Sequence, residues 1–123
     1  MTDSPVVIVV DDDDSLRDAM RRLLDAGGFS PVAYASGEAL MADGLRPEAA
    51  CVVTDLKLPG MSGLDLLARL KALRAPLPVV LITAHDDAHT RENALQHGAS
   101  AYIAKPFRGT ALLQVISSVL GRA

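Results

Sequence analysis

The amino-acid sequence predicts an α/β domain in which five strands and five helices alternate along the chain, a (βα)5 arrangement. Two observations predict it. Short apolar, mostly β-branched runs alternate with segments in which apolar residues recur at helical spacing. The connections between them are short, and glycine or proline marks most boundaries. Parallel strands joined by right-handed helical crossovers satisfy both observations, so we expect a doubly wound parallel sheet with helices on both faces.

The first half of the chain holds two strand–helix units. The β-branched run 5–10 is typical of a central parallel strand. An apolar stripe over 16–24 predicts the next helix, which the glycine pair 27–28 ends. The strand 31–35 opens with a proline, which favours the edge of a sheet, and a serine caps the helix 36–43.

The second half holds three more units. Ser62 and Asp65 have the spacing of a capping box at the start of a helix. The helix expected at 87–97 is polar and has few large apolar residues. The elements expected here are strands at 49–54, 79–83 and 101–104, helices at 62–73 and 87–97, and a last helix that carries the apolar residues between 112 and 120.

The strand order follows from how apolar each strand is. The second and fifth strands are short or begin with proline and belong at the edges, which favours the order 2-1-3-4-5. The switch point then lies between the first and third strands, where ligands bind in open α/β sheets. The acidic run 11–14 and Asp55 converge on this crevice, and Thr83 and Lys105 end the next two strands on the same rim.

Composition limits the number of domains, the class of partner and the location of the protein. The 123 residues are half apolar and 22% charged, as in one globular domain spanning 1–123. The net charge of −3 is spread without a basic patch, so we expect no direct nucleic-acid binding. The single cysteine, Cys51, suits a reducing compartment. The chain shows neither a membrane-length apolar run nor a secretion signal, which predicts a cytoplasmic location.

The acidic crevice predicts a divalent cation. Carboxylates gathered at one place repel one another, and Mg²⁺ resolves this because it prefers hard oxygen ligands. Asp12 and Asp55 are the expected ligands, with Asp11 holding waters or orienting the site. Asp13 and Asp14 more simply cap the first helix.

Lys105 and Thr83 add a cation and a hydroxyl to the same rim. Either residue alone would be ordinary surface. Together with Asp55 as a nucleophile and a metal ion, they are the parts that phosphoryl transfer to a carboxylate requires.

Four segments stand out at the strand ends: Val10-Asp11-Asp12-Asp13, residues 55–63, Ile82-Thr83-Ala84 and Lys105-Pro106-Phe107. They resemble the signature segments of response-regulator receiver domains, which have a flavodoxin-like fold. The resemblance covers essentially the whole chain, and no signature position is missing.

The resemblance implies a role for each site residue. Asp55 would be the phosphoacceptor, and Asp11, Asp12, Asp55 and the backbone carbonyl of Lys57 would bind Mg²⁺. Thr83 and Lys105 would contact the aspartyl phosphate, and Tyr102 would be the switch aromatic. The Lys105–Pro106 bond is expected to be cis.

The resemblance also implies the domain's partners. A sensor histidine kinase or a phosphotransfer protein would supply the phosphoryl group. An output domain or a second copy would bind the face formed by the fourth helix, fifth strand and fifth helix. Residues 54–63 are similar to receivers that precede a helix-turn-helix transcription output domain. Beyond its own phosphorylation and dephosphorylation, we expect no enzymatic activity.

Three other functions remain open on the residues alone. A flavin-binding module could share the strand order, but four successive aspartates would repel a flavin phosphate. A Mg²⁺-dependent phosphatase with an aspartyl intermediate would need a second acid near Asp55, where Lys57 stands instead. A receiver could also bind partners without being phosphorylated.

His85 and His89 have the four-residue spacing of the zinc-binding helix of metalloproteases. No third ligand is evident, so we expect two solvated histidines.

Overall fold

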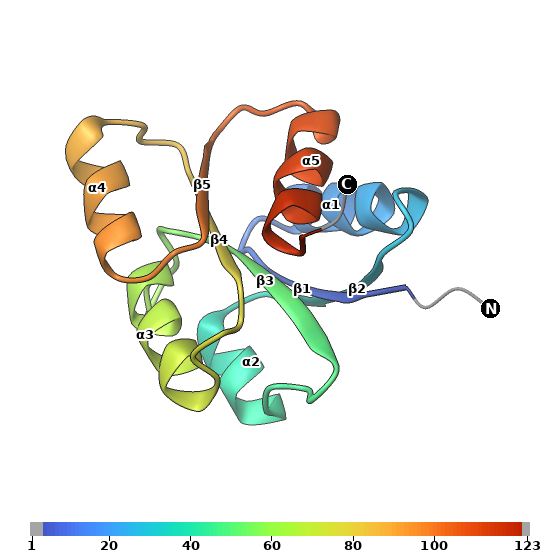
Figure 1. Cartoon of the computed structure of the whole chain (residues 1–123), viewed down its shortest axis with the longest axis horizontal. Coiled ribbons are helices and arrows are strands. Elements are labelled where there is room, and N and C mark those ends of the chain that lie inside the picture. The colour runs from blue at the N-terminus through green and yellow to red at the C-terminus, as the bar shows by residue number, and fades with distance from the viewer. Residues whose placement is uncertain (1–3, 122–123) are drawn as a thin grey trace.

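The computed structural model describes residues 4–121. It contains the expected alternation of five strands and five helices (Figure 1). The strands are β1 (Val6–Val10), β2 (Ser30–Tyr34), β3 (Ala49–Asp55), β4 (Val79–Thr83) and β5 (Ala101–Ala104). The helices are α1 (Asp14–Ala26), α2 (Gly37–Asp43), α3 (Gly63–Leu73), α4 (Ala88–Gln96) and α5 (Gly109–Val119).

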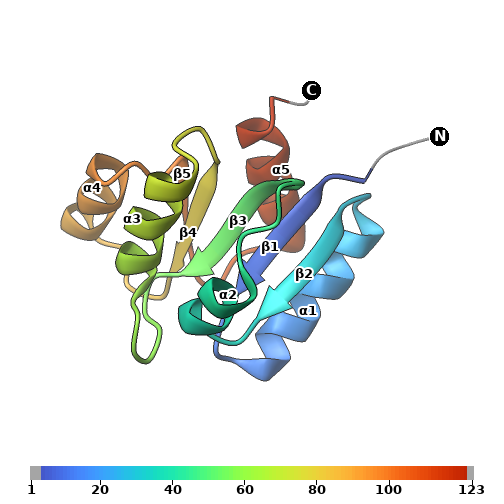
Figure 2. The same ribbon diagram turned by 90° about the horizontal axis from the view of Figure 1, so that it is seen from below.

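The strands form one parallel sheet in the order β2-β1-β3-β4-β5, which confirms the predicted order. Figure 2 shows the arrows of β1, β2 and β3 running in the same direction. In register, Val10 lies beside Thr54, and Asp55 lies beside Ile82. The ends of β1, β3 and β4 therefore lie next to one another at one edge of the sheet.

The helices cover both faces of the sheet, α1 and α5 on one and α2, α3 and α4 on the other (Figure 1). Side chains alternate between faces along a strand, so each face has its own apolar core. In β1, Ile8 and Val10 pack toward α2 and α3, whereas Val7 and Val9 pack toward α1 and α5. No helix within residues 4–121 is both long and apolar enough to cross a membrane.

The helix starts follow the expected capping chemistry. Asp13 caps α1 by accepting from the Leu16 amide, and Ser36 caps α2. The predicted capping box of Ser62 and Asp65 begins α3 and is confirmed in both directions. Helix α1 begins two residues before the apolar stripe, because its first turn is polar and carries no hydrophobic pattern.

Candidate functional site

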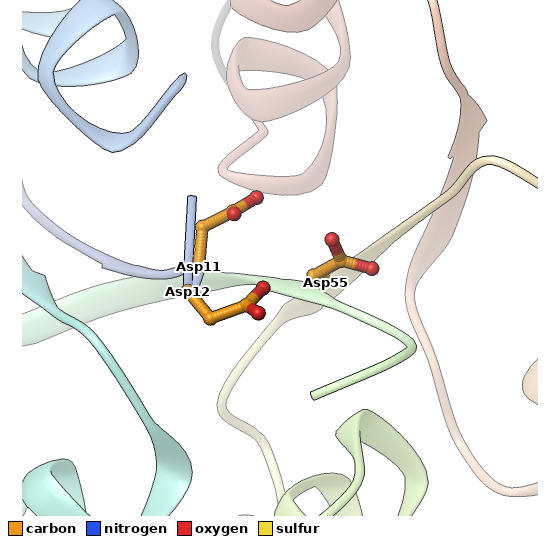
Figure 3. Close-up of side chains that lie close together, drawn as sticks. All are labelled: Asp11, Asp12 and Asp55. Carbon is orange, nitrogen blue, oxygen red and sulfur yellow. The ribbon is translucent and has the colours of Figure 1, made fainter. Parts of the chain in front are cut away.

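Three carboxylates meet where β1 and β3 end. Asp11 and Asp12 directly follow β1, and Asp55 is the last residue of β3. One oxygen from each lies within 4.8 Å of the others (Figure 3). The predicted convergence of these residues from two neighbouring strands is therefore present in the structure.

Asp11 is the most deeply buried member of this group: it is 0% exposed, Asp55 is 8% exposed, and Asp12 lies on the surface. Its Oδ1 accepts a hydrogen bond of 2.9 Å from the Asp13 amide. Its Oδ2 is buried and accepts no hydrogen bond from the residues that the structure describes. Burial is the main cause that raises the pKa of the Asp11 carboxyl. The Asp13 amide and Lys105 lower that pKa, and the charges of Asp55 and Asp12 raise it further.

Lys105 holds its ammonium over the carboxylates. Its Nζ lies 2.6 Å from Asp55 Oδ2 and 3.5 Å from Asp11 Oδ2. Burial opposes its charge, but the hydrogen bond to Asp55 and the charges of Asp11 and Asp55 outweigh burial and raise the pKa of Lys105. The Lys105–Pro106 bond is cis, as expected.

The charge at this site is not balanced by protein groups alone. One ammonium faces three carboxylates, and Asp11 Oδ2, buried among them 3.5 Å from Lys105 Nζ, accepts no hydrogen bond within residues 4–121. A buried charged oxygen that accepts no hydrogen bond is unfavourable. A hard divalent cation satisfies the oxygen and the excess charge together, so the donor set fits Mg²⁺.

Two further predicted residues lie on the same rim. Thr83, the buried last residue of β4, accepts a hydrogen bond of 3.0 Å from the His85 amide through its hydroxyl. Tyr102 on β5 donates its hydroxyl to the His85 carbonyl at 3.2 Å. Arg91 of α4 lies over the Tyr102 ring, 5.6 Å from its centroid, and pairs with Asp86 at 2.7 Å. The rim of β4 and β5 is thus tied to α4 by side chains.

The loop after β3 shapes the other side of the site. The Lys57 amide donates to Asp55 Oδ1 at 3.1 Å, and the Lys57 side chain is exposed. Farther along this loop, the Met61 amide donates to Glu38 Oε2 of α2 at 2.8 Å. Glu38 is 23 residues away in sequence, so no local pattern indicated this contact.

Arg17 lies outside the apolar stripe of α1, yet its side chain is only 20% exposed. Its guanidinium contacts the backbone of Asp11 instead. His85 and His89 are both exposed, as expected for solvated histidines.

The comparisons with known proteins agree with this geometry. Residues 7–117 match the family model of the response regulator receiver domain, and the chain belongs to that family. It is a phosphoacceptor module of two-component signalling. Family membership favours this function over the flavin-binding and phosphatase alternatives.

Individual relatives show how far the similarity extends. The transcriptional regulatory protein FixJ of Azorhizobium caulinodans is 35% identical over all 123 residues, which cover 58% of that protein. The chain therefore spans somewhat over half the length of this relative. The crystal structure of FixJ-N shares 33% identity at a TM-score of 0.84, covering 100% of this chain and 98% of that one. The BeF3-activated DrrB receiver domain shares 27% identity at a TM-score of 0.90, covering 98% and 100%.

Proposed function

We propose that Asp55 accepts a phosphoryl group from the phosphohistidine of a sensor kinase or phosphotransfer protein. The observation that carries the proposal is the convergence of three carboxylate oxygens within 4.8 Å, with Lys105 Nζ 2.6 Å from Asp55. Asp11, Asp12, Asp55 and the backbone carbonyl of Lys57 would hold Mg²⁺. When bound, Mg²⁺ supplies charge neutralisation for the phosphoryl oxygens and for the carboxylates.

The transfer is one substitution at phosphorus. A carboxylate oxygen of Asp55 forms the new O–P bond while the donor's N–P bond breaks, and its electron pair stays on the imidazole nitrogen. Lys105 already contacts Asp55 and would pair with the charge of the transferred group. Thr83, buried on the adjacent strand, would offer its hydroxyl to a phosphoryl oxygen.

The donor has an open groove from which to approach. A groove of about 770 Å³ lies between α1 and the loop after β5 and reaches Lys105. Its walls include Leu16, Met20 and Leu23 of α1 and Phe107 of the loop. An apolar surface beside the reacting group fits a helix of the donor protein.

The rim formed by the ends of β4 and β5 would change its conformation on phosphorylation. Movement of Thr83 toward a phosphate would disturb its bond with the His85 amide, and the Tyr102 hydroxyl binds the carbonyl of the same residue. Helix α4 is lightly anchored: Ala94 is its buried residue, and Leu95 is 48% exposed. The face of α4, β5 and α5 would then bind an output domain or a second copy.

The remaining parts of the proposal concern the chain as a whole. We assign residues 1–123 to one receiver domain that acts in the cytoplasm, where its buried free thiol, Cys51, would stay reduced. The domain would bind no nucleic acid itself, because its net charge is −3. It would catalyse only its own phosphorylation and dephosphorylation.

Intact-mass analysis tests this function. Wild-type protein incubated with acetyl phosphate and Mg²⁺ should gain one phosphoryl group, and Asp55→Asn should gain none. A chelator should prevent the label. A label that persists in Asp55→Asn would overturn the assignment of Asp55, and an unlabelled wild type would favour a receiver that is not phosphorylated. Turnover of a generic phosphate ester would instead favour a phosphatase.

A further inference from the structure

Arg17 lies against the acidic loop that the proposed cation site uses. Its Nη1 donates to the backbone carbonyl of Asp11 at 2.8 Å, and its Nη2 contacts Asp14 Oδ1 at 2.5 Å. The Arg17 side chain is 20% exposed, whereas Asp14 is 89% exposed. One nitrogen of the guanidinium is therefore bound to the Asp11 backbone and the other to the Asp14 carboxylate.

The position of Arg17 in α1 explains how it reaches this loop. Helical side chains lean toward the N-terminus of their own helix, so Arg17 extends back over the first turn. A cation there is opposed by the positive end of the helix dipole. Contacts with the Asp11 carbonyl and the Asp14 carboxylate offset that repulsion. One contact, with Asp14, thus lies within the first turn of α1, and the other reaches the loop that precedes the helix.

The carbonyl that Arg17 binds belongs to the peptide between Asp11 and Asp12. A peptide unit is planar, so fixing its carbonyl fixes the direction in which both flanking residues leave it. Other contacts hold the same loop: the Asp11 amide donates to the Tyr34 carbonyl at 3.2 Å, and Asp11 Oδ1 accepts from the Asp13 amide. The Arg17 contact acts on the carbonyl side of Asp11.

We infer that Arg17 is a positioning residue for the cation site: it orients the Asp11–Asp12 peptide so that both carboxylates face Asp55. The inference rests on the proposed function, because it assigns these carboxylates to Mg²⁺. Loss of the contact leaves the carbonyl of the Asp11–Asp12 peptide less firmly held, so the two carboxylates must be ordered further when the cation binds. Arg17 therefore strengthens Mg²⁺ binding, although its own charge has the same sign as the ion.

Charge alone predicts the opposite effect. A guanidinium near the carboxylates repels a second cation, so removing it would tighten Mg²⁺ binding if electrostatics dominated. Positioning predicts weaker binding on removal. The sign of the change in affinity therefore distinguishes the two effects.

Arg21 provides the matched control. It lies on the same helix and is exposed, and it makes no ion pair within residues 4–121. Arg21→Gln removes the same charge without touching the Asp11 backbone. Arg17→Lys retains the charge but loses the fork that reaches two acceptors at once.

The experiment measures Mg²⁺ affinity of the full chain by isothermal titration calorimetry, with metal-free thermal unfolding recorded alongside. Arg17→Gln should weaken Mg²⁺ binding by about tenfold or more, as is typical of residues that orient metal ligands. Arg17→Lys should fall between this variant and wild type, and Arg21→Gln should match wild type or bind slightly tighter. At saturating Mg²⁺, Arg17→Gln should regain most of its labelling by acetyl phosphate.

Two outcomes would overturn the inference. One is that Arg17→Gln binds Mg²⁺ as tightly as wild type or more tightly. The other is that it loses thermal stability with no change in affinity, which would indicate a role in folding alone. If Arg17→Gln does not fold, unchanged affinity in Arg17→Lys counts against the inference in the same way. A wild type that binds no Mg²⁺ would overturn the proposed metal site itself, and this inference with it.

Discussion

At the scale of single residues, Asp11 is the least favourable group of the site when no cation is bound. Its side chain is fully buried, one oxygen accepts no hydrogen bond within residues 4–121, and two other carboxylates lie close by. Burial raises the pKa of Asp11, so the folded chain holds this proton more tightly than the unfolded chain does. Folding is then favoured below the ordinary carboxyl pKa of about 4, and that advantage is lost as pH rises through the raised value.

Replacing this carboxyl should therefore stabilise the metal-free protein. At pH 7, Asp11→Asn removes a buried charge and keeps an oxygen that can accept from the Asp13 amide. We expect its free energy of unfolding in chelator to exceed that of wild type by on the order of 1 kcal/mol. Urea denaturation measures this difference, and Mg²⁺ should stabilise wild type much more than the variant. A variant less stable than wild type in chelator would contradict this account of Asp11.

The residues that could be predicted from sequence differ in kind from those that could not. Asp55 and Thr83 end recognisable strands and Lys105 directly follows one, so strand order alone brings them to one rim. Arg17 and Glu38 act through backbone groups of other loops. Such contacts depend on how the loop bends, which apolar periodicity does not encode.

At the scale of elements, the packing between β3 and α3 places Asp55. Gly63, the first residue of α3, is buried, and its amide donates to the Leu56 carbonyl at 2.8 Å. A β-carbon at Gly63 would collide with the backbone carbonyl of Asp55 and with the Leu56 Cα. Helix α3 therefore begins directly against the backbone of the candidate phosphoacceptor.

Gly63→Ala should be destabilising, and Gly109→Ala provides its control. Both glycines are the first residue of a helix, but a β-carbon at Gly109 would meet only side-chain atoms of Leu23, 2.8 Å away, which can move. We expect Gly63→Ala to lower the free energy of unfolding by about 2 kcal/mol and Gly109→Ala by much less. Phosphorylation should also slow in Gly63→Ala because Asp55 shifts. Equal losses in urea denaturation would contradict a specific close approach at Gly63.

Some element boundaries follow from the local sequence pattern, whereas others depend on pairing with a distant strand. Strands β1, β3 and β4 match their apolar runs closely, because a strand buried on both faces is apolar along its whole length. The edge strand β2 begins at Ser30, one residue before the proline that was expected to open it. Its pairing with β1 is what extends it, through the register of Val6 with Ser30.

At the scale of the whole molecule, the sheet divides the interior into two apolar cores. Cys51 lies in the core beneath α1 and α5, on the central strand β3, and is fully buried. The strand order could be predicted because only central strands are covered on both faces, and the most apolar strands had to occupy those places. The side chains between sheet and helices could not be placed from sequence, because packing depends on the final angles of the helices.

Cys51 reports the opening of this core. Burial raises the pKa of its thiol to about 12, whereas an unfolded cysteine titrates near 8.5, at about its ordinary pKa. Between these values the unfolded chain loses a proton that the folded chain keeps, so rising pH in this range disfavours folding.

At pH 8 a disulfide reagent should react with Cys51 of the native protein only when the core opens, and immediately in denaturant. Mg²⁺ should slow the native reaction in wild type, because ligand binding stabilises the folded state, and a chelator should abolish the slowing. Rapid labelling of Cys51 in native buffer with Mg²⁺ would mean that the helices on the two faces of the sheet do not protect β3 from solvent. A strand covered so loosely could not hold Asp55 in place for phosphoryl transfer.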